Sequence, residues 1–189
     1  LLRATVLVTL GGRLWSLVHK PTGRELLYRN PVFQPANLAI RNAWFSGGVE
    51  WNCSVRGHSV FTCSPVFAAE VRRDDGCPVL RLYEWERIRQ VAYQVDLCLP
   101  DGSAFLYVYV RIVNPHEDTI PMYWWSNIAV PDVPGARVVV PADRTCVGNY
   151  RGKMSCLPVP IHEGLDVTHP ANHHNARDLF FRLPDDARP

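Results

Sequence analysis

Two short runs of the sequence combine aromatic and hydrogen-bonding side chains in a way that suits a polyol ligand. Residues 42–52 read Asn-Ala-Trp-Phe-Ser-Gly-Gly-Val-Glu-Trp-Asn, residues 122–127 read Met-Tyr-Trp-Trp-Ser-Asn, and together they hold four of the six tryptophans. A sugar ring presents an apolar C–H face that stacks on indole, and hydroxyl groups that need paired donors and acceptors. These runs therefore favour carbohydrate recognition. The alternative is that the tryptophans form the core of a β-protein, because tryptophan is highly buried on average.

The first run also carries groups that can transfer protons. Glu50 and Asn52 have the same parity, so in an extended segment both point to one face and Trp51 points to the other. His58 follows a few residues later, and either Glu50 or His58 is a candidate for acid/base catalysis. The alternative is a β-bulge at 47–48, around which Glu50 and His58 satisfy buried backbone groups.

The second run places an indole and an amide on one face of a predicted strand. Trp125 and Asn127 share this face with Tyr123, and such a face is unusual for an apolar sandwich core. Arg87 lies in a segment with charge on both faces and is a further candidate donor to a hydroxyl or carboxylate. The predicted carbohydrate-binding residues are Trp51, Asn52, Arg87, Trp125 and Asn127.

No metal or cofactor site is predicted. The six cysteines form no C-x-x-C pair, and the histidines of residues 162–174 match no recognised metal motif. A phosphate-binding glycine loop and a dinucleotide fingerprint are also missing from the sequence. We expect the cysteines to be free, mostly buried thiols in a cytoplasmic protein.

Length and charge limit the class of protein. The 189 residues predict a single domain, residues 1–189, and we expect it to be a piece of a longer chain. The net charge of +2 and the scattered arginines argue against a nucleic-acid partner. No apolar run approaches the length of about 18 residues that a membrane helix needs, so no membrane partner is expected.

Period-two alternation of apolar and polar residues predicts an all-β fold, an antiparallel β-sandwich. The alternation is clearest over residues 103–113, where positions 106, 108, 110 and 112 are aliphatic and positions 105, 107, 109 and 111 carry aromatic rings or arginine. The predicted strands are 4–10, 13–19, 58–63, 66–72, 78–87, 91–99, 103–113, 121–130 and 137–140. Residues 141–178 contain several prolines and glycines, and we expect a long irregular loop there, followed by a strand at 178–183.

The motifs at positions 11–17, 23–30, 47–52, 57–59 and 123–131 form a recognisable series. With them the chain resembles the uncharacterised β-sandwich domain near the N-terminus of large bacterial proteins that carry tetratricopeptide repeats. That family is similar in turn to the galactose-mutarotase-like supersandwich, which includes aldose epimerases. The resemblance implies that this chain is an incomplete, C-terminally shortened supersandwich with a sugar site on the concave face of one sheet. Tyr123 occupies the position of the epimerases' catalytic histidine.

The leading hypothesis is a carbohydrate-binding or carbohydrate-processing domain of a larger repeat protein, with a small-molecule or oligosaccharide ligand. One alternative is an aldose-epimerase-like or glycoside-hydrolase-like enzyme that uses Glu50 and His58. Another is a scaffold without a ligand, which we expect if Glu50, His58, Trp125 and Asn127 are all buried and bonded to one another. An exposed sheet edge would also allow a homodimer.

Overall fold

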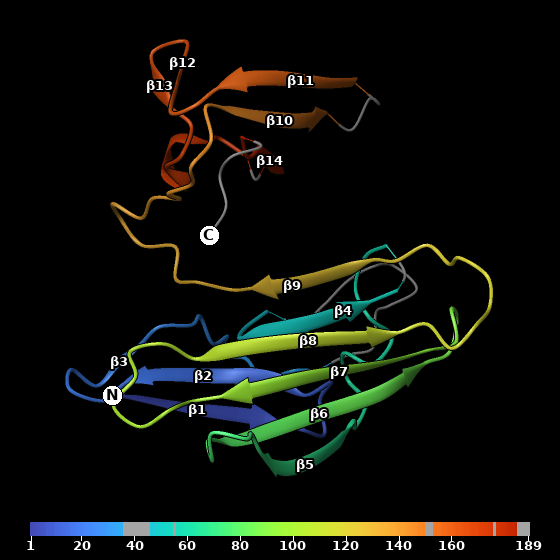
Figure 1. Ribbon diagram of the computed structural model, residues 1–189. Coiled ribbons are helices and arrows are strands. Elements are labelled where there is room, and N and C mark those ends of the chain that lie inside the picture. The colour runs from blue at the N-terminus through green and yellow to red at the C-terminus, as the bar shows by residue number, and fades with distance from the viewer. Residues whose placement is uncertain (36–45, 55, 150–152, 176, 185–189) are drawn as a thin grey trace. The chain divides into compact units, whose positions relative to one another are not determined.

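The computed structural model describes residues 1–35, 46–54, 56–149, 153–175 and 177–184 (Figure 1). The chain divides into two compact units, Leu1–Val130 and Pro131–Pro189, and each is described by itself. The predicted fold class is confirmed, because the described residues form antiparallel sheets and contain no α-helix. The single domain over residues 1–189 stays a prediction.

Unit 1 contains two antiparallel sheets. In the first sheet the order is β1-β2-β4-β9, and the short strand β3 pairs with β2 beside this path. The bounds are Leu2–Leu7 for β1, Arg13–His19 for β2, Arg24–Glu25 for β3, Val49–Cys53 for β4 and Trp124–Ile128 for β9. The second sheet has the order β5-β6-β7-β8. Its strands are Phe67–Arg72, Pro78–Glu86, Val91–Cys98 and Tyr107–Val113.

The core of unit 1 lies between these two sheets. Leu14, Val49 and Trp51 come from the first sheet, and Leu82 and Val95 come from the second, in one cluster of buried residues. The second sheet contributes one face of its strands to this core. In β7, residues 91, 93, 95 and 97 are buried while the residues between them are half-buried, as alternation of side chains predicts. Unit 1 is therefore a sandwich whose inner faces are apolar.

Strand β4 is buried on both of its faces, with every residue from Val49 to Cys53 inside. One face meets the second sheet. The other face is covered by the turns that follow β4, since the Ser59 N–H donates to the side chain of Asn52 at 2.6 Å. Because both faces of β4 are buried, the polar side chains of Glu50 and Asn52 lie out of solvent.

Unit 2 corrects the prediction of a long irregular loop over residues 141–178. Strands β10, Arg144–Asn149, and β11, Lys153–Pro158, pair there with each other, and β10 also pairs with β14, Leu179–Arg182. Proline does not prevent this, because Pro158 lies at the end of β11, an edge strand. A short hairpin of β12, Ile161–His162, and β13, Leu165–Asp166, and the 3-10 helix Pro170–Asn172 lie between β11 and β14.

Two other predicted strands are wrong. Residues 58–63 form turns, held by hydrogen bonds from Thr62 N–H to the Ser59 carbonyl and from Ser64 N–H to the Phe61 carbonyl. Residues 137–140 have no strand partner among the described residues, although the Val138 N–H bonds the Thr168 carbonyl. The apolar pattern of these short segments was not sufficient to predict strands, because strand identity also requires a pairing neighbour.

The cysteines are all thiols, as expected, but only Cys53 and Cys98 are buried. Burial raises the pKa of the Cys53 thiol to about 12. In the described part of the chain, no helix is long and apolar enough to cross a membrane.

Candidate functional site

Strands β4 and β9 bring most of the predicted site residues to one side of their sheet. Their register pairs Glu50 with Asn127 and Asn52 with Trp125. Directly opposite residues of an antiparallel pair share a face, so these four side chains lie on the side of the sheet away from the second sheet. The side-chain directions that the sequence predicted for each strand therefore agree with the observed pairing of β4 and β9.

Two glycines let the start of β4 approach β2 closely. Gly47 and Gly48 have φ of 130° and 68°, in the left-handed region that favours glycine. A Cβ on Gly48 would lie 2.3 Å from the Leu14 carbonyl oxygen, and one on Gly47 would lie 2.6 Å from the Trp15 ring. This close approach brings Arg13 of β2 beneath β4, where its Nη1 donates to the Gly47 carbonyl at 2.9 Å.

The Glu50 carboxylate is the centre of a buried polar cluster. Its Oε1 accepts from the Thr62 hydroxyl and from Arg13 Nη2 at 3.3 Å. Its Oε2 accepts from Asn52 Nδ2 at 3.2 Å and contacts His58 Nδ1 at 2.6 Å. We call these five residues the Glu50 cluster. Both carboxylate oxygens therefore have two partners each, which is close to what a buried carboxylate requires.

The charges of the cluster lie out of solvent. The side chains of Arg13 and Glu50 are 1% and 2% exposed, and that of His58 is 10% exposed. Burial lowers the pKa of the Arg13 guanidinium, while the nearby Glu50 carboxylate and Cys63 oppose this change. Desolvation of a buried ion pair offsets much of its attraction, but the loss of one partner leaves a costly unpaired charge.

His58 links the buried cluster to a more accessible aromatic ring. Its imidazole lies 4.9 Å from the Trp125 ring, centroid to centroid, at an interplanar angle of 46°. Trp125 is half-buried, and Asn127 is half-buried two residues further along the same face. Among the described residues, no hydrogen bond involves the side-chain amide of Asn127, so its NH2 group and its oxygen remain for water or a ligand.

Trp51 and Asn52 are both buried, Trp51 beside a cavity between the two sheets and Asn52 within the Glu50 cluster, so neither presents an exposed side chain for the predicted ligand role. Trp51 is buried in the core, stacks on Trp124 at 6.5 Å and donates its indole N–H to the Gly12 carbonyl at 2.9 Å. Asn52 is fully buried, where it holds Glu50 and the Ser59 backbone. The middle position of β4 in its sheet buries both residues.

Arg87 is exposed and lies over the Phe61 ring, with its Cζ 5.6 Å from the ring centroid. Phe61 belongs to the same turns as His58, so Arg87 stands beside that segment. No described contact joins Arg87 to Glu50 or His58.

Sequence reasoning missed Arg13 and Thr62, which are both fully buried in the Glu50 cluster. Arg13 follows a glycine pair and precedes an apolar run, a context that predicts no buried charge. Thr62 lies in residues 58–63, which were expected to be a strand. Only the long-range contacts of the fold bring both to Glu50.

The cluster provides a carboxylate that orients an imidazole. Because an ionised carboxylate only accepts hydrogen bonds, Nδ1 of His58 carries the proton in this contact, and in the neutral ring Nε2 then holds the lone pair. Such an arrangement serves acid/base chemistry or hydroxyl binding equally well. Within the described residues, no group of three or more His, Cys, Asp or Glu side chains could hold a metal ion.

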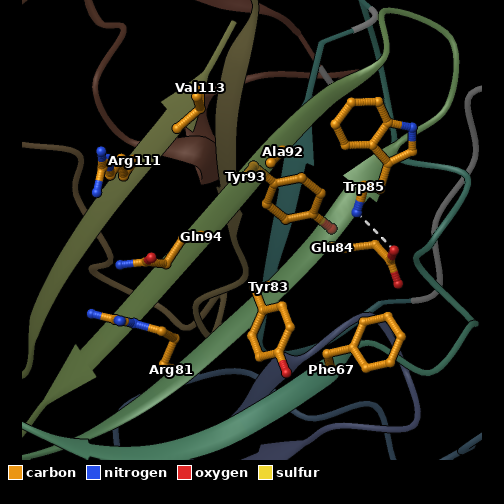
Figure 2. Close-up of a pocket in the computed structure, with 10 residues that line it drawn as sticks. All are labelled: Phe67, Arg81, Tyr83, Glu84, Trp85, Ala92, Tyr93, Gln94, Arg111 and Val113. Carbon is orange, nitrogen blue, oxygen red and sulfur yellow. Dashed lines mark hydrogen bonds between the residues drawn. The ribbon is translucent and has the colours of Figure 1, made fainter. Parts of the chain in front are cut away.

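Two cavities of unit 1 lie away from the Glu50 cluster. One, of about 500 Å³, opens between the two sheets and is lined by apolar side chains such as Leu17, Leu106 and Trp124. The other, of about 550 Å³, is an open groove on the second sheet, lined by Phe67, Tyr83 and other residues drawn in Figure 2.

The fold and the cluster together define an antiparallel β-sandwich with a carboxylate–imidazole pair buried beneath a half-exposed tryptophan. The chain belongs to the family described as a domain of unknown function, DUF5107, which matches residues 1–180.

The fold is similar to part of the crystal structure of a TPR-domain containing protein from Parabacteroides distasonis. The TM-score is 0.76 with 24% sequence identity, and the match covers 87% of this chain and 28% of that one. This chain thus spans less than a third of the length of that protein. The expected relation to an uncharacterised domain, with a structural counterpart in a TPR-domain containing bacterial protein, is confirmed.

Proposed function

We propose that unit 1 recognises carbohydrate on the face of β4 and β9 that carries His58, Trp125 and Asn127, as a domain of a larger protein with helical repeats. The proposal includes the resemblance to the galactose-mutarotase-like supersandwich, in which sugars bind on a concave sheet face. The similar Parabacteroides protein is described as containing a TPR domain, which supports the part of the proposal that concerns a larger protein with helical repeats.

The observation that carries the proposal is the half-buried Trp125 ring packed against the imidazole of His58. Glu50 holds that imidazole at 2.6 Å, so its orientation is fixed before any ligand arrives. A fixed ring beside a half-exposed indole can bond a hydroxyl while the indole stacks on the C–H face of the sugar.

Asn127 would supply the second polar contact. It lies two residues from Trp125 on the same face of β9, which places their Cα atoms about 7 Å apart. Its amide offers both a donor and an acceptor, as hydroxyl recognition requires.

Titration of the full chain with neutral mono- and oligosaccharides, followed by calorimetry and thermal shift, tests this site. A ligand at 100 times its dissociation constant should stabilise the protein by about 2.7 kcal/mol. Trp125→Ala should remove binding at this site, and Phe180→Ala, which removes an exposed aromatic ring from unit 2, should preserve it. The proposal fails if no sugar binds, or if both variants bind as well as the wild type.

An enzyme that acts on sugars is the second candidate, favoured by the short contact between His58 and Glu50. Anomer interconversion followed by polarimetry would test it, with His58→Gln expected to remove the activity. Glycoside cleavage by Glu50 is less well supported, because the Glu50 side chain is only 2% exposed and both of its carboxylate oxygens are bonded by side chains of the protein.

The scaffold alternative is favoured by the burial and mutual bonding of Glu50 and Asn52, but the half-exposed Trp125 and Asn127 do not fit it. Self-association through an edge strand, β1 or β9 of the first sheet and β5 or β8 of the second, stays a proposal, as does a cytoplasmic location.

A further inference from the structure

The second sheet of unit 1 carries an open groove on the side away from the core. Its outward-facing side chains include Phe67, Tyr83, Trp85, Gln94, Arg111 and Val113, and its volume of about 550 Å³ is in the usual range for ligand sites (Figure 2). None of these residues belongs to the Glu50 cluster or contacts it.

The pairing of β6, β7 and β8 explains the shape of the groove. Tyr83 on β6 pairs with Gln94 on β7, and Gln94 pairs with Arg111 on β8. In the next row, Ala92 lies between Trp85 and Val113, so a methyl group forms the floor there. The walls stand two strand spacings apart, about 10 Å, which leaves room for one ring above β7.

The wall on the β5 and β6 side is aromatic. The Phe67 and Tyr83 rings stack at 5.4 Å with an interplanar angle of 17°, and they are 60% and 42% exposed. Trp85 is 45% exposed on the same face, two residues from Tyr83. Exposed, mutually supported rings on a rigid sheet are a suitable platform for the C–H face of a sugar.

The opposite wall carries a cation that is not neutralised. Arg111 is exposed, and the described residues give its guanidinium no hydrogen bond and no ion pair. The neighbouring Arg81 is different, because it forms two hydrogen bonds of 2.8 and 2.7 Å with Asp96. Glu84 lies beside Trp85, at the far end of the groove from Arg111 (Figure 2). The groove therefore has a positive end at Arg111.

Gln94 separates the two walls and is held in place. Its Nε2 donates to Asp96 Oδ2 at 3.0 Å, which fixes the amide and leaves its oxygen to accept from a ligand hydroxyl. A ligand that fits this groove has an apolar ring face, hydroxyl groups and a carboxylate at one end.

We propose that this groove is a second binding site, separate from that of Trp125, and that it takes acidic saccharides such as hexuronate oligomers. The sugar ring packs on Tyr83 and Trp85, a hydroxyl donates to Gln94, and the uronate carboxylate pairs with Arg111. The inference does not depend on the Trp125 site, because no residue is shared between the two.

The test uses the full chain and two probes of equal size, a galacturonate trisaccharide and its carboxyl-reduced neutral counterpart, measured by calorimetry at fixed ionic strength. The galacturonate should bind at least about tenfold more tightly, since hydrogen bonds between charged groups are stronger than neutral ones. Arg111→Gln should remove this preference, while Arg3→Gln, the same change on the exposed side of β1, should leave it unchanged. Tyr83→Ala should weaken the binding of both trisaccharides.

Separate outcomes distinguish the two sites. Retention of galacturonate binding in Trp125→Ala supports the groove, whereas its loss in that variant would move the ligand to the Trp125 site and overturn the inference. Equal affinity for the two trisaccharides, or an Arg111→Gln variant that binds as the wild type does, would also overturn it. An acidic hexapeptide that binds more tightly than the galacturonate, with the same dependence on Arg111, would refute the saccharide class. Melting temperatures confirm that each variant is folded.

Discussion

Replacement of Glu50 with glutamine tests whether the Glu50 cluster supports the fold. The change keeps the shape of the side chain and removes the charge that faces the buried guanidinium of Arg13. In the wild type, one carboxylate oxygen accepts from Arg13 and Thr62 and the other is bonded by Asn52 and His58. A glutamine amide has one accepting oxygen and one donating NH2 group. In either orientation, that NH2 group faces two side chains that donate in the wild type.

The expected loss follows from this arrangement. Removal of one partner of a buried ion pair costs about 3–5 kcal/mol, and each unmet buried donor costs about 1–3 kcal/mol. The Thr62 hydroxyl can rotate and His58 can change tautomer, so we expect the lower end, about 3 kcal/mol. For a protein of this size, that loss lowers the melting temperature by about 6–12 °C.

Urea denaturation followed by circular dichroism and tryptophan fluorescence measures the effect, as a fall in the midpoint at constant m-value. Glu70→Gln is the matched control, because Glu70 is exposed on β5 and its change should stay within about 0.5 kcal/mol. The double variant Arg13→Met, Glu50→Gln should cost less than the sum of the single changes by about 1–3 kcal/mol.

A loss below about 1 kcal/mol in Glu50→Gln, or strict additivity in the double variant, would refute the reasoning. A gain in stability would show that the buried charge opposes folding and would favour a functional reason for its presence. Sugar binding measured on the same variant then separates a structural role from a binding role.

Three further predictions concern other parts of the fold. Gly48→Ala should destabilise the protein by at least about 2 kcal/mol, because Gly48 has a φ of 68° and an added Cβ would lie 2.3 Å from a carbonyl oxygen. The loss should clearly exceed that of Gly23→Ala, since Gly23 has a φ of 67° but open space around it. Equal urea midpoints for the two variants would contradict this prediction. Cys146 and Cys156 lie opposite each other on β10 and β11 with sulfur atoms 2.9 Å apart, so oxidised glutathione should convert them to a disulfide, with loss of two titratable thiols and release of two reduced glutathione molecules. The hydrogen bond with Cys156 raises the pKa of Cys146, so this reaction should accelerate toward alkaline pH, and unchanged thiol counts in the oxidant would argue against the pairing. Burial alone would raise the pKa of Glu25, but hydrogen bonds from Ser16 and two backbone N–H groups outweigh it and lower the pKa. Its stabilisation is therefore complete above the unfolded pKa of about 4.3 and is lost as pH falls through the lower folded pKa; acid denaturation of Glu25→Gln should show a shallower slope, and an identical slope would disprove this contribution.

Much of unit 1 was predictable because alternation is a local property. The pattern of residues 91–98 predicts strand β7 and its buried face, and the parity of Trp125 and Asn127 correctly predicts that they share a face. Local pattern failed at residues 58–63 and at the β10–β11 hairpin, where the outcome depended on distant partners.

The sequence by itself determined the all-β class, most strands of unit 1 and the fact that Glu50 and Asn52 point the same way, because side-chain direction follows from backbone period. Only the tertiary structure decided that this face of β4 is covered by turns and supplied with the guanidinium of Arg13 and the hydroxyl of Thr62. It also decided that the aromatic rings of β5 and β6 stay exposed, across the groove from Arg111. The two-residue alternation of side chains specifies the two faces of a strand, but which face meets solvent depends on packing partners that are far away in the chain.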